Sequence, residues 1–171
     1  MARFASLEIH KDEFSFSAGH FTIFSATERE QLHGHNYYVS IAFNIQIEHN
    51  GLSFDYRDYK KKIHTLCDKL DRFLLLPQHS PYLKINDEGD HWAAHFDHKK
   101  MLFLKEDVVM LPLTNITIEE LSHWFLQQLT VDTAALAKDA IHGIEVKVYN
   151  GPGQAGGATW GDMRLSEISP K

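Results

Sequence analysis

Three histidines stand where their imidazoles could bind one metal ion. His33 and His35 are separated only by Gly34, and His20 lies at the expected end of the preceding strand. Residues two apart on a strand point to the same face, and a glycine between them lets the backbone come close. Three neutral imidazoles leave a fourth tetrahedral position free, as in catalytic rather than structural zinc sites. Taken alone, the His-x-His pair also fits two exposed strand histidines.

The other histidines and the cysteine have simpler interpretations. The chain has 12 histidines, of which His91, His95 and His98 lie together in a polar stretch. We interpret these three as surface residues, with a second metal site as the alternative. Cys67 is the only cysteine and falls in an apolar helical stripe, so it is expected in the core. A single cysteine also excludes an intrachain disulfide.

Hydrophobic patterns predict the elements that must position these residues. Strands are expected at residues 8–17, 36–47 and 141–149, with a loop at 18–30 that carries Glu30. Shorter strands are expected at residues 101–104 and 108–112. The glycine-rich residues 151–161 lack the Lys-Ser/Thr ending of a phosphate loop and are interpreted as a flexible closing segment.

Two helices are expected between these strands. One begins with Asp55 as its N-cap and carries an apolar stripe that ends at Leu70. The other covers residues 118–129, and Thr117 with Glu120 three residues later forms a capping box at its start. The order of strands and helices predicts an α+β fold rather than alternating βαβ units.

Composition narrows the class of protein. A chain of 171 residues with 43% hydrophobic residues suits one domain over residues 1–171. The net charge of -6 argues against a nucleic-acid partner. No stretch has the length and apolarity of a signal or membrane segment, so no membrane partner and a cytoplasmic location are expected.

The histidines lie within a longer motif that resembles a known family. Phe-Ser-Ala-x-His at residues 16–20, then Leu-His-Gly-His-Asn-Tyr at residues 32–37, is the signature of the 6-pyruvoyltetrahydropterin synthases. The related 6-carboxytetrahydropterin synthases of the queuosine pathway share it. Further similar segments extend the resemblance over most of the chain, at residues 51–56, 70–71, 117–120 and 146–149.

The resemblance implies a T-fold and a zinc enzyme. Each subunit of this family has a four-stranded antiparallel sheet with two helices on one face. Subunits form trimer-based homo-oligomers, usually hexamers, with active sites between them. For this chain the resemblance implies Zn²⁺ held by His20, His33 and His35. The family's reaction acts on 7,8-dihydroneopterin triphosphate, in queuosine or tetrahydrobiopterin-type pathways.

The chain departs from the family at the position of the base. The family's cysteine lies four residues before the first histidine of the pair, where this chain has Arg29, which cannot act as a base. Glu30, three residues before His33, matches a branch of the family that uses glutamate there. It would serve as a general base if burial raised its pKa. The alternative is a solvated loop carboxylate.

Four further positions are predicted by resemblance. Asp71 matches the family's Asp-His pair and would assist catalysis, whereas Arg72 replaces the histidine and would contact phosphate or carboxylate. The alternative for both is a surface ion pair. Glu119 matches a Thr-x-Glu segment, or is simply a residue of a first helical turn. Asn150 stands where the family anchors the pterin with glutamate, and would bind a heterocycle edge or form a turn.

These residues predict a zinc-dependent lyase of the 6-pyruvoyl/6-carboxytetrahydropterin synthase type. Its substrate would be 7,8-dihydroneopterin triphosphate or a related small heterocycle. The alternative is a non-catalytic zinc-containing T-fold protein that binds a pterin- or purine-like ligand. Mutation of Glu30 distinguishes the two, because only the enzyme would lose turnover while keeping the metal.

Overall fold

The main sheet of the protein is built around four long antiparallel strands. The computed structural model describes residues 3–48 and 50–164. These four strands lie side by side in the order β1-β2-β8-β9. They are β1 (Arg3–His20), β2 (His33–Ile47), β8 (Ile141–Gly151) and β9 (Gln154–Gly161). Two short strands, β3 (Phe73–Pro77) and β7 (Val108–Leu111), extend the sheet beyond β1, and β3 pairs with β1 in parallel.

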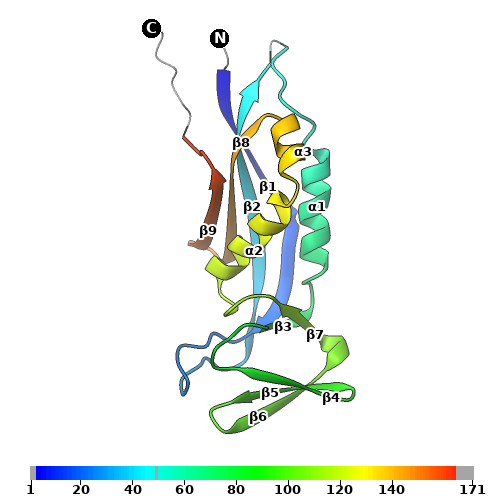
Figure 1. The fold of residues 1–171 in the computed structure, drawn as a ribbon, viewed down its shortest axis with the longest axis vertical. Coiled ribbons are helices and arrows are strands. Elements are labelled where there is room, and N and C mark those ends of the chain that lie inside the picture. The colour runs from blue at the N-terminus through cyan, green and yellow to red at the C-terminus, as the bar shows by residue number, and fades with distance from the viewer. Residues whose placement is uncertain (1–2, 49, 165–171) are drawn as a thin grey trace.

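Three helices pack on one face of this sheet (Figure 1). They are α1 (Arg57–Asp68), α2 (Ile118–Thr130) and the short α3 (Thr133–Lys138). The alternating apolar residues of the long strands and the helical stripes bury one another, and the centre of this core includes Phe14, Phe16, Tyr37, Ile63, Leu121, Phe125 and Val146. The predicted α+β class is confirmed. Within the described residues the main sheet has six strands rather than the predicted four, because β3 and β7 join it, and three helices rather than two pack on it.

A second, smaller sheet lies at one end of the main sheet (Figure 1). It has three antiparallel strands, β4 (Lys84–Glu88), β5 (His91–Phe96) and β6 (Lys99–Leu104), followed by the one-turn helix η1 (Lys105–Asp107). A separate hydrophobic cluster joins this sheet to the loop between β1 and β2, and includes Phe21, Ile23, Leu76, Leu83, Ala94 and Phe96. The small sheet therefore supports the loop that precedes His33.

Two expectations about secondary structure were wrong. Residues 151–161 were interpreted as a flexible closing segment, but Gln154–Gly161 forms β9 because it pairs along β8. Asp55 is not the N-cap of α1; Tyr56 occupies that position, and the Asp55 carboxylate instead accepts the amide of Arg57. Among the residues described, no helix is long and apolar enough to cross a membrane.

Candidate metal-binding and active site

The pairing of β1 with β2 brings the three predicted histidines together. His20 lies directly opposite His33, and Ala18 lies opposite His35. Opposite residues of an antiparallel pair share a face, as do residues two apart on one strand. All three imidazoles therefore stand on the same face, and one ligand atom from each lies within 4.8 Å of the others. This arrangement is one that could hold a metal ion.

Backbone carbonyls orient two of the imidazoles. His20 Nδ1 lies 2.9 Å from the oxygen of Ile116, and His33 Nδ1 lies 2.8 Å from that of Gln31. A carbonyl oxygen can only accept, so in both rings Nδ1 carries the proton and the neutral imidazole has its lone pair on Nε2. His33 Nε2 in turn lies 3.0 Å from His35 Nε2. Metal-binding histidines are commonly oriented by a bond from their second ring nitrogen to a backbone carbonyl.

His20 provides the test of whether these residues fit a metal ion. Its side chain is 5% exposed, and its buried Nε2 has no hydrogen-bond partner among the residues described. A buried ring nitrogen without a partner is unfavourable unless something binds it. Burial also lowers the pKa of His20, helped by the neighbouring His33 and His35 and opposed by the bond to Ile116. The neutral form that ligates metals is therefore favoured, and the site fits a divalent ion.

Three of the other predicted residues share a cavity with the histidines. The cavity has a volume of about 190 Å³, and Glu30, Glu119 and Asn150 line it. It lies between the ends of β1 and β2, the first turn of α2 and the β8–β9 hairpin. Tyr37, Thr22 and Gln154 line it as well. Of these, Tyr37 belongs to the histidine motif, whereas Thr22 and Gln154 carried no signal in the sequence.

Glu30 is held by the backbone of Thr22. The amide of Thr22 donates to Glu30 Oε2 at 3.0 Å, and the amide of Glu30 donates to the oxygen of Thr22 at 2.8 Å. Burial alone would raise the pKa of Glu30, but the bonds from Thr22 and the nearby His33 and His20 outweigh it and lower this pKa. The condition considered from the sequence, a pKa raised by burial, is therefore not met. Glu30 is a carboxylate at neutral pH.

Asp71 and Arg72 lie outside this cavity. The carboxylate of Asp71 accepts the amide of Ser17 at 2.8 Å and pairs with Arg72 Nε at 3.2 Å, an exposed ion pair. Arg72 lines a different cavity of about 520 Å³, together with Asn36 and Asp107. Within one chain, the bonds of Asp71 and Arg72 to Ser17 tie the turn before β3 to β1, and His35 lines the cavity of Arg72 as well.

The fold and the cavity define a T-fold protein with a histidine triad that could bind a metal ion. A sequence model described as 6-pyruvoyl tetrahydropterin synthase matches residues 8–157. The chain therefore belongs to the 6-pyruvoyl tetrahydropterin synthase family. This membership supports a lyase-type enzyme of pterin metabolism.

The names of individual similar proteins are consistent with this family. A Methanocaldococcus jannaschii protein, provisionally named 6-carboxy-5,6,7,8-tetrahydropterin synthase, is 29% identical over 81% of this chain and 85% of its own length. The 6-pyruvoyl tetrahydropterin synthase of Plasmodium falciparum has a TM-score of 0.88 at 29% identity, covering 94% of this chain and 99% of its own. A Plasmodium vivax synthase with the same values was solved with alanine in place of a glutamate described as a catalytic residue.

Proposed function

We propose that this protein is a zinc-dependent lyase that acts on 7,8-dihydroneopterin triphosphate or a closely related heterocycle, with Glu30 as its base. The observation that carries the proposal is the presence of Glu30 and three convergent imidazoles in one cavity. The Plasmodium vivax synthase with a catalytic glutamate supports the same role for Glu30.

The donor set suits zinc, with His20, His33 and His35 as its ligands. Three neutral nitrogen ligands and an open position are typical of catalytic zinc sites. When bound, the ion would supply Lewis-acid polarisation of the oxygen atoms on the substrate's side chain. Backbone oxygens occupy the Nδ1 atoms of His20 and His33, so Nε2 of each ring would be the ligand atom.

Glu30 would remove a proton from the side chain of the substrate. Its lowered pKa keeps the carboxylate ionised at neutral pH, so no prior deprotonation is needed. The bond from the amide of Thr22 to Oε2 holds one carboxylate oxygen and leaves Oε1 available to accept the proton. A lowered pKa makes a weaker base, so the proton transfer depends on close positioning.

The opposite wall of the cavity would bind the heterocycle. Glu119, Asn150 and Gln154 line it and offer one carboxylate and two amides. An amide both donates and accepts, so Asn150 suits a heterocycle edge that presents one group of each kind. Asp71 and Arg72 would act in a homo-oligomer, at the site of a neighbouring copy, as the family's shared active sites imply.

A non-catalytic binding protein is the second candidate. The neutral Asn150 in the cavity and Arg72 outside it favour this candidate, because both replace residues that serve the family's reaction. A protein of this kind would bind the metal and a heterocycle without converting it.

The variant Glu30→Gln tests the proposal. We expect the zinc-loaded variant to convert 7,8-dihydroneopterin triphosphate about 10²–10⁴-fold more slowly than the native protein, because an amide cannot take the proton. Products are followed by mass spectrometry, and zinc content is expected to stay unchanged. Glu28→Gln, an exposed carboxylate on the same loop, is the matched control. Equal turnover by the native protein and Glu30→Gln would exclude Glu30 as the base.

A further inference from the structure

The guanidinium of Arg29 contacts groups from three parts of the chain. Its central carbon lies 4.8 Å from the centre of the Phe21 ring and 5.8 Å from that of Phe96. Nη2 donates to the sulfur of Met101 at 3.4 Å, and Nη1 donates to the backbone oxygen of Glu30 at 2.6 Å. Phe96 belongs to β5 and Met101 to β6. Arg29 therefore connects the small sheet to the main chain of Glu30.

Glu30 is consequently held at both ends of its backbone. Its amide donates to the oxygen of Thr22, and its oxygen accepts from Arg29. The amide of Thr22 then donates to the Glu30 carboxylate at 3.0 Å. The direction of the carboxylate follows from the backbone that carries it, so a shift of the Glu30 carbonyl would displace the carboxylate from the cavity.

We propose that Arg29 is a positioning residue, which uses the small sheet β4–β6 as a rigid support to aim the Glu30 carboxylate at the histidine cavity. The meaning of this role for catalysis rests on the proposed function of Glu30. Arg29 itself takes no part in proton transfer, because its guanidinium stays protonated.

The contacts require arginine rather than any cation. A planar guanidinium can lie against an aromatic ring and donate from two nitrogens in fixed directions at the same time. Lysine at this position could keep the charge near Phe21 but could not make both directed bonds. The half-buried position of Arg29 also limits competition from water.

The test compares Arg29→Met and Arg29→Lys with the native, zinc-loaded protein. For Arg29→Met we expect kcat on 7,8-dihydroneopterin triphosphate to fall about a hundredfold, because a small displacement of the base is sufficient for such a loss. KM is expected to stay within about threefold, since substrate binding is not touched. Hydrogen exchange at the amides of Thr22 and Glu30 is expected to become faster. The kcat of Arg29→Lys should lie between those of the native protein and Arg29→Met. If Arg29→Met does not fold, Arg29→Lys is the variant that tests the proposal.

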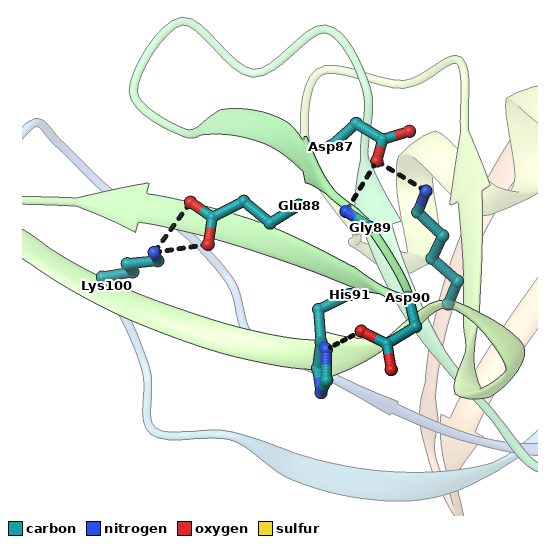
Figure 2. A network of polar contacts seen from close by, with 7 residues as sticks. Asp87, Glu88, Gly89, Asp90, His91 and Lys100 are labelled. Carbon is teal, nitrogen blue, oxygen red and sulfur yellow. Dashed lines mark hydrogen bonds and ion pairs between the residues drawn. The ribbon is translucent and has the colours of Figure 1, made fainter.

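Lys100→Met is the matched control. Lys100 lies on β6 and donates to the carboxylate of Glu88 on β4 at 2.6 and 2.7 Å, so its ion pair stays within the small sheet (Figure 2). We expect it to leave kcat and both exchange rates unchanged. Unchanged kcat in both Arg29 variants, a rise in KM alone, or unchanged exchange at Thr22 and Glu30 would overturn the proposal. If the native protein does not convert the substrate, the proposed function fails, and the exchange rates alone decide whether Arg29 positions Glu30.

Discussion

At the scale of single residues, the imidazole of His20 has one backbone partner and lies beside two other imidazoles and the ring of Tyr37. Its ring centre lies 4.6 Å from that of His33 and 5.2 Å from that of His35. Two of the three rings are held by carbonyls, so the protein itself orients these candidate ligands. We expect a site of this kind to bind one ion per chain.

Removal of one ligand should abolish metal binding. In His20→Ala the remaining pair cannot hold a tetrahedral ion, so we expect zinc to fall from about one per chain to near zero. Elemental analysis of dialysed protein measures the content. The control is His123→Gln, a histidine exposed on α2. Full zinc content in His20→Ala would show that the ion binds elsewhere.

Burial of His20 also predicts how stability depends on pH. The pKa of His20 is lowered from its ordinary value of 6.5 in the folded protein. Below about pH 6.5, His20 therefore binds a proton in the unfolded chain more readily than in the folded chain. The free energy of unfolding of the metal-free protein consequently falls as pH drops through about 6.5. Thermal unfolding between pH 8 and 5 measures the slope. His20→Gln should have a shallower slope, and an identical slope in both proteins would contradict the assignment to His20.

The sequence predicted the histidine triad better than the state of Glu30. Spacing on paired strands is a local property, and the two-residue interval between His33 and His35 was enough to place both on one face. The pKa of Glu30 depends on Thr22, which reaches it across a loop, and no local pattern indicates such a contact.

At the scale of elements, close packing of β9 against α2 forms one wall of the cavity. A side chain at Gly156 would place its Cβ 2.5 Å from the carbonyl carbon of Ile118 and 2.6 Å from the amide nitrogen of Glu119. These are backbone atoms, which cannot move aside without shifting the start of α2. The glycine therefore allows Glu119 and Gln154 to line the same cavity.

The variant Gly156→Ala tests this packing. We expect it to lower the free energy of unfolding by about 1–3 kcal/mol, because the strand and the helix must separate. Denaturant unfolding measures the change. Gly157→Ala is the control, since its Cβ would meet its nearest neighbours at an ordinary 3.6 Å. Equal stability of the two variants would mean that the contact is not needed.

The elements that the sequence predicted are those with long alternating or helical patterns. The strands at residues 8–17, 36–47 and 141–149 and both long helices are present. The strand β9 was missed because glycine-rich residues have low strand propensity, and its pairing with β8 and packing against α2 are tertiary contacts that no local pattern indicates. The strands β3, β4 and β5 were also missed, because they are five or six residues long and have no clear alternation of apolar and polar residues.

At the scale of the whole molecule, two hydrophobic clusters hold different segments of the candidate site. The larger cluster joins the main sheet to the helices and holds the paired strands that carry the histidines. The smaller cluster joins the three-stranded sheet to the loop that carries Glu30. The candidate metal ligands and the candidate base are thus carried by segments that different clusters hold, and both line one cavity.

We propose that the metal and Glu30 act together on one substrate. The most direct measurement is the conversion of 7,8-dihydroneopterin triphosphate, followed by mass spectrometry, with zinc-loaded and with metal-stripped protein. We predict loss of triphosphate or cleavage of the side chain by the loaded protein only, with recovery when zinc is added back. An untouched substrate with the loaded protein, or equal conversion by the stripped protein, would contradict the account.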